Sequence, residues 1–383
     1  MEFRDLRKQY EVLKTDIDKS VSEVLAAGKF ISGPQVTELE HALATYTDTK
    51  HCITCANGTD ALTLALMVWK VGPGDAVFVP DFTFFASGEA PAYEGATPIF
   101  VDVERDTFNM SPDSLEQAII QVKKEGILIP RVIVAVDLFG QPANYPEIKK
   151  IAKKYDLLIL EDGAQGFGGG IGRRKACSFG DISTTSFFPA KPLGCYGDGG
   201  AVFTDDDQWA DLMRSYKVHG KGADRYDNVR VGINSRLDTL QAAILLVKLK
   251  ALQEYELEAV NAAADRYRKE LEDCREFVKT PLVREGYVSS WAQYSVLLKD
   301  RAMRDGLWEW LKEKGIPTMI YYPKSMSGQT AFKGLDCIKV DMPAARDLCE
   351  RVLALPMHPY ITEKEQSVIV KEIKLFIQSR SKV

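Results

Sequence analysis

Lys191 is the residue of this sequence whose surroundings are best suited to covalent chemistry. It lies in a loop between Pro189 and Pro192, after a serine and two phenylalanines at positions 186–188. Each proline fixes its own backbone and restricts its neighbour, so the loop is stiff and partly apolar. Partial burial disfavours the ammonium form, and a neutral lysine can attack a carbonyl to form a Schiff base. The alternative is a surface lysine in a tight turn, because most lysines of folded proteins are exposed.

Asp162 is placed where a binding site is expected. It follows the strongly apolar run from Leu157 to Leu160, which predicts a buried strand. In an open parallel sheet, ligands bind at the carboxyl ends of the strands. A buried carboxylate needs a cationic partner, which is either a positive charge on a ligand or a structural arginine.

Two further strand ends carry residues suited to a ligand. Asn57-Gly58-Thr59 opens a predicted helix, where a glycine permits close approach and free N–H groups can bind a phosphate. The alternative at this position is an ordinary capped helix. The aromatic run from Phe82 to Phe85 would either stack on a planar ligand or pack in the core.

From about residue 50 the sequence alternates short strand-like runs with helical stretches. This alternation predicts an α/β fold with a mostly parallel sheet covered by helices. The strand runs are nearly continuously apolar, as expected for strands buried on both faces. Strands are predicted at His51 to Cys55, Ala76 to Pro80, Pro98 to Val103, Val132 to Asp137 and Leu157 to Leu160, with helices between them such as Pro112 to Val122 and Tyr145 to Tyr155.

A different pattern begins near Asn234. Apolar residues recur there at helical spacing, in a helix that can continue to about Leu271 and join two domains. Beyond it, the pattern predicts strands at 293–298 and 317–322 and helices at 301–314, near Ala344 and near Glu363. We therefore expect a large domain at residues 1–250 and a smaller C-terminal α/β domain at 251–383, a division that the chain length also favours.

Composition excludes several classes of function. The chain has 383 residues and 49 basic against 54 acidic side chains, with no basic block to follow a nucleic acid backbone. No apolar run is long enough for a membrane span and the start does not resemble a signal peptide, so we expect a cytoplasmic protein. The seven cysteines include one Cys52-x-x-Cys55 pair with no second pair, which we interpret as buried strand positions rather than a metal site.

Together these features are what pyridoxal 5′-phosphate requires: a lysine for its aldehyde, an anion beside its ring nitrogen, a phosphate site and a surface for stacking. The sequence resembles the DegT/StrS family of nucleotide-sugar aminotransferases, which have the fold-type I architecture of pyridoxal-phosphate-dependent transferases. The resemblance covers nearly the full length. It rests on Gly33-Pro34, Asn57-Gly58-Thr59-Asp60-Ala61-Leu62, Phe82-Thr83-Phe84, Glu161-Asp162-Gly163-Ala164-Gln165, Ser178-Phe179-Gly180-Asp181, Ser186 through Gly200, Asn234-Ser235-Arg236-Leu237 and Leu355-Pro356-Met357-His358-Pro359.

The resemblance assigns a role to each matching residue. It implies that Lys191 binds the cofactor and moves the proton, and that Asp162 pairs with the ring nitrogen. It further implies that Phe84 stacks on the ring and that Gln165 contacts the ring hydroxyl. The implied phosphate site consists of Gly58, Thr59 and Ser186, with Asn234 from a second subunit, and therefore implies a homodimer with shared active sites. Gly163 departs from the alanine that is more common in relatives, which affects only local packing.

The amino-acid sequences around Lys191 and Asn234 are most similar to those of enzymes that aminate a UDP-linked 3-oxo-hexuronate. These enzymes use L-glutamate as donor and serve the synthesis of bacterial surface polysaccharide (O-antigen). A uronate carries a carboxylate, and the guanidinium of Arg236 matches its shape with two hydrogen bonds. A structural ion pair is the alternative for Arg236. Further expected substrate contacts are Tyr321, Tyr322, His219 and His358, although a histidine at either position is as well explained by a satisfied core side chain.

Four other functions are weighed against this one. A neutral 3-keto or 4-keto sugar on another nucleotide would use the same chemistry. A sugar dehydratase of the same fold keeps no such lysine, so Lys191 argues against it. The run 168–172, Gly-Gly-Gly-Ile-Gly, prompts a nucleotide-binding oxidoreductase, but a turn rather than a helix follows it, so the dinucleotide fingerprint fails. A non-catalytic regulator that binds the cofactor is the fourth.

Overall fold

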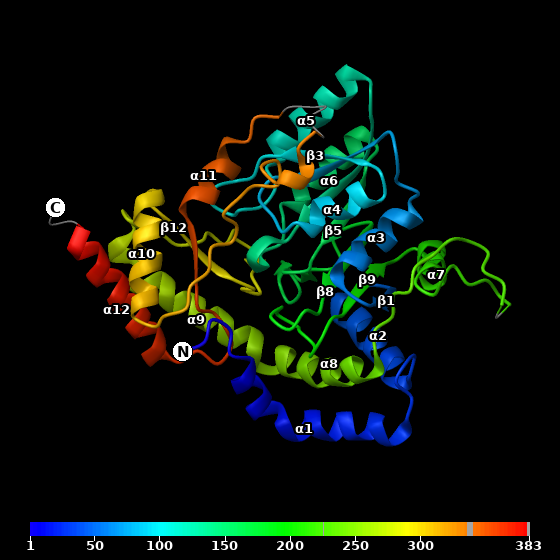
Figure 1. Ribbon diagram of the computed structural model, residues 1–383, viewed down its shortest axis with the longest axis horizontal. Helices are drawn as coiled ribbons and strands as arrows, with labels where there is room; N and C mark the ends of the chain where they lie inside the picture. Colours follow the sequence, from blue (N-terminus) through cyan, green and yellow to red (C-terminus); the bar gives the residue numbers. More distant parts are fainter. Residues whose placement is uncertain (225, 335–339, 381–383) are drawn as a thin grey trace.

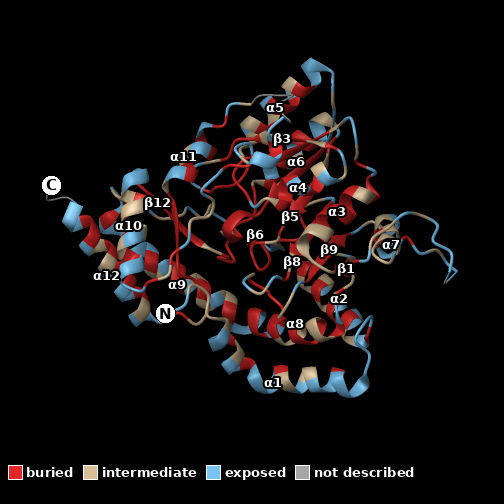
Figure 2. Cartoon of the chain, in the orientation of Figure 1, coloured by how far each residue is buried: buried red, intermediate tan, exposed pale blue. Residues whose placement is uncertain are grey.

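The computed structural model describes residues 1–224, 226–334 and 340–380. A large sheet lies at the centre with helices around it, and the C-terminal helices gather at one end of the molecule (Figure 1). Buried residues concentrate on the sheet and on the inner sides of the helices (Figure 2). No helix within these ranges is both long and apolar enough to cross a lipid bilayer. The predicted α/β fold is confirmed.

The central sheet has seven strands in the order β1-β9-β8-β5-β4-β2-β3. They are β1 (His51–Cys55), β2 (Asp75–Pro80), β3 (Thr97–Val101), β4 (Ile129–Val136), β5 (Leu158–Asp162), β8 (Ile182–Ser186) and β9 (Gly200–Thr204). Only β9 is antiparallel to its neighbours in this sheet, so the other six strands end at the same edge. β1 to β5 correspond to the five predicted strands, which confirms the reading of their apolar runs.

Helices pack on both faces of this sheet. They are α2 (Pro34–Thr47), α3 (Gly58–Val68), α4 (Ala86–Tyr93), α5 (Pro112–Glu125), α6 (Tyr145–Tyr155), α7 (Asp207–Tyr216) and α8 (Thr239–Ala251), with the 3-10 turn η1 (Leu138–Gly140). α1 (Leu6–Ala27) packs on the outer side of α8 and not on the sheet (Figure 1). Apolar side chains of α3, α4 and α7 share one core cluster, and those of α5 and α6 share another. α2 and α8 form a third cluster with Phe187, Leu193 and Cys195, so the loop that carries Lys191 is anchored by apolar packing on both sides of the lysine.

The C-terminal part has its own small sheet and core. Its elements are the π-helical turn η2 (Leu252–Glu256), α9 (Leu257–Glu270), η3 (Glu272–Cys274), β10 (Val278–Lys279), β12 (Tyr294–Leu298), α10 (Arg301–Glu313), η4 (Thr330–Phe332), α11 (Pro343–Arg351), β13 (Val352–Leu355) and α12 (Glu363–Arg380). β12 is the middle strand between β10 and β13, and α9, α10 and α12 bury apolar side chains with it. A third sheet joins β11 (Tyr287–Val288) to β6 (Gly170–Ile171) and β7 (Arg174–Lys175). The domain division at residue 250 stays a prediction, since α8 continues through η2 into α9.

One predicted element is wrong. Residues 317–322 do not form a strand, and only Met319 pairs there, through an isolated bridge to Ala354. Pro317 has no N–H to donate, and Pro323 directly follows the segment with the same defect. The two prolines remove the N–H donors at the ends of the segment, and between them only Met319 exchanges backbone hydrogen bonds with Ala354, at 3.2 and 2.7 Å.

Candidate active site

The predicted site residues come together because four strands end at the same edge of the sheet. β5 ends at Asp162, and its neighbour β8 ends at Ser186, from which the loop leads to Lys191. β1 leads through Asn57 into α3, and β2 leads to Phe84. Side chains that are far apart in the sequence therefore gather at one place, as the strand-end argument predicts.

Lys191 is half-buried and its backbone is fixed on both sides. Its N–H donates to the Phe188 carbonyl at 2.8 Å, and its carbonyl accepts from Nη2 of Arg4 at 2.8 Å. Burial lowers the pKa of the Lys191 amine to about 8; the Asp162 carboxylate raises this pKa and the Arg4 guanidinium lowers it further. A larger fraction of this amine is neutral near pH 7 than in an exposed lysine, which is the state that attacks carbonyls. The exposed-turn alternative does not fit this burial.

Asp162 is a buried carboxylate without a cation at ion-pair distance in the described ranges. Its side chain is 6% exposed. Oδ2 accepts from the Ser87 hydroxyl at 2.7 Å and Oδ1 accepts from the Ala164 N–H at 3.2 Å. Burial raises the pKa of Asp162 above its usual value, while these hydrogen bonds and the charge of Lys191 act in the opposite direction. The structural-arginine alternative is not found, and the carboxylate keeps lone pairs for a ligand.

Ser87 is a member of this site that the sequence did not reveal. It lies on α4, 75 residues before Asp162, and its hydroxyl is also 3.2 Å from that of Thr83. A serine in the first turn of a helix is common, so no local signal marks this one as the partner of a distant carboxylate.

Gln165, Tyr322 and Phe84 stand next to this carboxylate. The buried Gln165 accepts the Phe139 N–H at 2.8 Å through Oε1 and donates from Nε2 to the Tyr322 hydroxyl at 3.0 Å. Phe84 is 54% exposed and its ring centre is 6.4 Å from that of Tyr322, whereas Phe82 is 1% exposed. The aromatic run therefore serves both expected purposes, with Phe82 in the core and the ring of Phe84 available to a ligand.

The first turn of α3 forms a narrow cradle against the end of β8. Asn57 caps the helix, since its Oδ1 accepts from the Asp60 N–H at 2.8 Å. A Cβ added to Gly58 would lie 2.7 Å from Cβ and 3.2 Å from Oγ of Ser186. The first N–H groups of a helix, here those of Gly58 and Thr59, have no acceptor within the helix and carry its positive dipole end. These groups and the Ser186 hydroxyl can bind a phosphate.

Asn234 and Arg236 are close to each other but not in contact with Lys191 of the same chain. They line a cavity of about 480 Å³ with Ile31, Ala56, Gly197, Asp198, Asp238 and Gln241. The Ala56 N–H donates to Oγ of Ser235 at 3.0 Å, which holds this segment beside the residues that precede α3. Arg236 has no carboxylate at ion-pair distance in the described part of the chain, so the ion-pair alternative is absent from this subunit.

The remaining predicted residues lie at other places. His219 is exposed with φ of 63° and does not line the cavity of Asn234. His358 is 3% exposed, and its buried Nδ1 has no hydrogen-bond partner among the residues that the structure describes. Burial lowers the pKa of His358 to about 4, with the charge of Arg4 acting in the same direction, so this imidazole is neutral. The ring of Tyr321, half-buried, is 5.7 Å from that of Tyr322.

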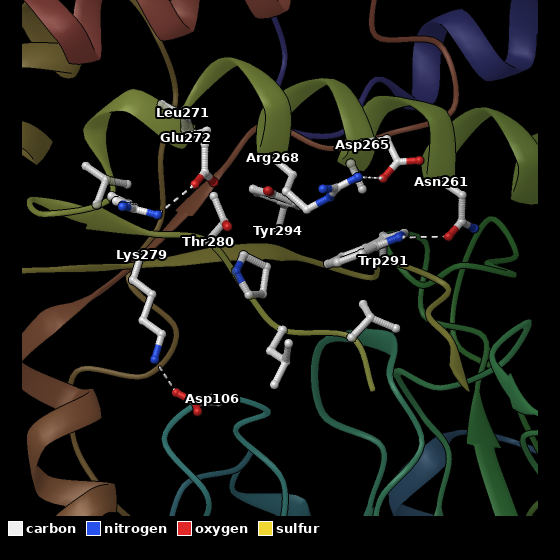
Figure 3. A pocket seen from close by; sticks show the side chains of 16 residues that line it. Asp106, Asn261, Asp265, Arg268, Leu271, Glu272, Lys279, Thr280, Trp291 and Tyr294 are labelled. Atoms are coloured by element: carbon white, nitrogen blue, oxygen red, sulfur yellow. Dashed lines mark hydrogen bonds and ion pairs between the residues drawn. The ribbon is translucent and has the colours of Figure 1, made fainter. Parts of the chain in front are cut away.

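A second cavity, of about 660 Å³, lies between α9 and β10 and is lined by none of the predicted site residues (Figure 3). Its charged side chains pair with one another, as Arg268 does with Asp265 at 3.0 Å and Lys279 with Asp106. Its walls leave no uncompensated charge for a ligand.

Within the described ranges, no group of three or more His, Cys, Asp or Glu side chains is arranged to hold a metal ion. Cys52 and Cys55 are both buried on β1 with free thiols, which confirms their interpretation as strand positions.

The residues at the edge of the sheet fit pyridoxal 5′-phosphate on three counts. The glycine at 58 leaves the helix start open where any Cβ would press on Ser186. The carboxylate of Asp162 lacks the cation that a protonated ring nitrogen would supply. Lys191 has an amine whose lowered pKa favours its neutral form. When bound, the cofactor supplies an aldehyde that binds amines and a ring that accepts the electrons of a broken C–H bond.

Comparisons with known proteins agree with this arrangement. The DegT/DnrJ/EryC1/StrS aminotransferase family matches residues 11–374. A UDP-2-acetamido-2-deoxy-3-oxo-D-glucuronate aminotransferase of Pseudomonas aeruginosa is 41% identical over 96% of this chain and 98% of its own length. A pleiotropic regulatory protein of Geobacillus stearothermophilus is 39% identical over 97% of each chain.

Solved structures give the same result. A DegT/DnrJ/EryC1/StrS aminotransferase from Brucella abortus has a TM-score of 0.95 and 48% identity, and the alignment covers 98% of this chain and 99% of that one. A Bacillus subtilis protein with bound cofactor PMP has a TM-score of 0.87 and 30% identity, over 96% of this chain and 82% of that one. The chain belongs to the DegT/DnrJ/EryC1/StrS family of pyridoxal-phosphate-dependent sugar aminotransferases.

Proposed function

We propose that this enzyme transfers the amino group of L-glutamate to a UDP-linked 3-oxo-hexuronate, giving 2-oxoglutarate and the 3-amino sugar. The observation that carries the proposal is the 41% identity with the Pseudomonas aeruginosa aminotransferase over almost the whole of both chains. Differences in bound sugar do not change the amination chemistry, so a neutral 3-keto or 4-keto nucleotide sugar is the competing substrate. We further propose that the product serves bacterial surface polysaccharide (O-antigen) synthesis and that the enzyme works in the cytoplasm.

Lys191 and Asp162 are assigned the chemical steps. The neutral amine of Lys191 attaches the cofactor and, once released, takes the α-proton of glutamate and later delivers a proton to the carbon that becomes the amine-bearing carbon of the sugar. Asp162 keeps the ring nitrogen protonated, and its burial makes that ion pair strong. Ser87 holds Oδ2 of Asp162 at 2.7 Å, which fixes the direction of the remaining lone pairs.

The other residues are assigned to positioning. Gln165, held by Phe139 and Tyr322, presents its remaining N–H to the ring hydroxyl, and Phe84 stacks on the ring. The N–H groups of Gly58 and Thr59 and the hydroxyl of Ser186 bind the phosphate. The hydrogen bonds of Gln165 and the close approach of Gly58 to Ser186 support these assignments. The affinity for pyridoxal 5′-phosphate, measured in alanine variants of these residues, tests them.

Asn234 is assigned to the phosphate of the neighbouring subunit in a homodimer with shared sites. It is exposed, and within one chain it has no contact with Lys191, so its proposed role requires a second copy. Mixing two inactive variants, Lys191→Ala and Asn234→Ala, tests this arrangement. Shared sites predict that an equimolar mixture recovers up to about a quarter of wild-type activity, because about half of the dimers are mixed and one of the two sites in each mixed dimer is intact. Sites formed within one chain predict no recovery.

Arg236 is the proposed reader of the uronate carboxylate. It lines the cavity of about 480 Å³ with Asn234 and has no carboxylate partner within ion-pair distance among the described residues. The test compares a UDP-3-oxo-hexuronate with a neutral 4-oxo nucleotide sugar. We expect Arg236→Ala to reduce kcat/KM for the uronate by about 100-fold, or roughly 3 kcal/mol, and to change the neutral sugar little. Equal losses on both substrates would refute the role in carboxylate recognition.

Because the chain is also similar to a regulatory protein, a non-catalytic function is the alternative to test. The two functions differ in one product. An aminotransferase releases 2-oxoglutarate when glutamate is added, whereas a regulator that only binds the cofactor releases none. Measuring 2-oxoglutarate with wild-type and Lys191→Ala protein separates them. We expect release from the wild type alone, and no release from either would refute the proposed activity. His219, Tyr321, Tyr322 and His358 remain proposed substrate contacts.

A further inference from the structure

The first residues of the chain pack against the loop that carries Lys191. Nη2 of Arg4 donates to the Lys191 carbonyl at 2.8 Å, across 187 positions of sequence. The carbonyl of Phe3 accepts from the Met357 N–H at 3.2 Å, and the Phe3 ring meets that of Tyr321 edge-on at 6.1 Å. Figure 1 shows the N-terminus at the end of the molecule where the C-terminal helices gather. The N-terminal segment thus joins the lysine loop to the C-terminal part.

The charge of Arg4 is not neutralised locally. In the described ranges no carboxylate lies at ion-pair distance from Arg4, and burial lowers the pKa of its guanidinium to about 10. The anion that acts on it is Glu256, whose carboxylate is already held by Gln9 at 2.8 Å and by Tyr360 at 2.6 Å. Lys248 is a second buried cation near Arg4. It is 1% exposed, and its Nζ lies 5.0 Å from the centre of the Tyr196 ring.

This arrangement leaves a cation fixed next to the backbone of the lysine. The groups that act on the Lys191 amine are Asp162, which favours the ammonium form, and Arg4, which opposes it. The amine itself makes no hydrogen bond to a described residue, so its position depends on the backbone that carries it. That backbone is held at the N–H by Phe188 and at the carbonyl by Arg4.

We propose that Arg4 is a positioning residue for Lys191, holding its carbonyl while placing an uncompensated positive charge beside its amine. The inference rests on the role of Lys191 given under Proposed function. The competing role for Arg4 is purely structural, as a tie between the N-terminal segment and the rest of the fold. A structural tie affects stability, whereas a positioning residue also changes the acidity of the lysine and the rate of the step in which it moves a proton.

The test uses Arg4→Gln, which removes the charge, and Arg4→Lys, which keeps it. Arg7→Gln is the matched control, because Arg7 is exposed on α1 only three positions away. Phe3→Ala is a second control, which loosens the same segment and leaves Arg4 unchanged. Two quantities are measured in the full chain: the pH midpoint of the absorbance of the bound cofactor, and the acylation rate of Lys191 by acetic anhydride at pH 8 after the cofactor is removed, by peptide mass spectrometry.

With Arg4→Gln we expect the absorbance midpoint to rise by about half a pH unit or more, since a cation that opposes protonation is removed. Acylation of Lys191 should slow by about twofold or more, because the neutral fraction of the amine at pH 8 falls from about one half to about one quarter when its pKa rises from about 8 by half a unit. We also expect kcat to fall by about tenfold with little change in KM for glutamate, and Arg4→Lys to recover most of both effects. The two controls should match the wild type in midpoint and acylation rate.

The inference is overturned if Arg4→Gln matches Arg7→Gln in midpoint and acylation rate, or if Phe3→Ala causes the same shifts as Arg4→Gln. Borohydride reduction of the wild type, followed by peptide mapping, separates this failure from that of the underlying assignment. Cofactor mass on the Lys191 peptide with no shift in Arg4→Gln refutes the role of Arg4 alone. Cofactor mass on another lysine refutes the assignment of Lys191 and the inference with it.

Discussion

Replacing Gly58 by alanine tests the phosphate cradle directly. The new Cβ would lie 2.7 Å from Cβ of Ser186. Carbon atoms pack at about 3.5–4.0 Å, so the start of α3 and the end of β8 must separate by roughly 1 Å. Forcing an extra carbon into a packed site costs about 1–3 kcal/mol. Because the shift also moves the N–H groups of Gly58 and Thr59 away from the phosphate, we expect the Kd for pyridoxal 5′-phosphate to rise by about 5- to 150-fold.

The assay is a titration of cofactor-free protein with pyridoxal 5′-phosphate, followed by absorbance, with thermal unfolding measured in parallel. Gly72→Ala is the matched control, because the only atom within 4 Å of its added Cβ is the Glu94 carbonyl oxygen at 3.7 Å. Adding Ser186→Gly to Gly58→Ala removes the obstructing side chain and should restore the Tm lost in the single variant. A Gly58→Ala protein with the Kd and Tm of the wild type would show that the cradle does not hold the phosphate as argued.

Two further predictions concern Ser87 and Lys248. Ser87→Ala removes the 2.7 Å bond to Asp162 and should reduce kcat by about tenfold with little change in Tm; an unchanged kcat would refute the orienting role. Burial lowers the pKa of Lys248 in the folded state to about 8, from 10.5 in the unfolded chain. Between these two pH values the folded state binds fewer protons than the unfolded state. The free energy of unfolding of the wild type should therefore rise with pH across this window. Lys248→Met should therefore raise Tm at pH 7 and lose this advantage toward pH 10, as measured by thermal unfolding; a Tm gain that is independent of pH would contradict it.

The sequence predicts the parallel strands well because their signal is local and strong. β4 from Val132 to Val136 and β5 from Leu158 to Leu160 are unbroken apolar runs, and all of these residues except Leu158 are buried, so composition and environment agree. Helix starts can also be predicted where the capping residue is close in sequence. Ser111 directly precedes Pro112, the first residue of α5, and its Oγ accepts from the Ser114 N–H at 3.3 Å. The strand-end rule then places Asp162, Lys191 and Gly58 together without any knowledge of their contacts.

What the sequence could not show depends on distant partners. The hydrogen bonds of Ser87 to Asp162 and of Arg4 to Lys191 span 75 and 187 positions, and neither residue has a neighbour that hints at its partner. The false strand at 317–322 fails for a related reason. Its residues include β-branched and aromatic types that favour strands, but a strand also needs a partner with free backbone groups and its own N–H donors, which depend on the fold and on the two flanking prolines.

The contact between Phe3 and Met357 has a consequence for the synthesis of the protein. The N–H that bonds to the Phe3 carbonyl belongs to a residue that is synthesised 354 positions later. At about 5–20 residues per second, the N-terminal segment waits roughly 20 to 70 s for that partner. The central sheet can form during this interval. A nascent chain can therefore form its central sheet before the bond between Phe3 and Met357 is possible, and the N-terminal segment that holds the Lys191 carbonyl gains this contact only after Met357 is synthesised.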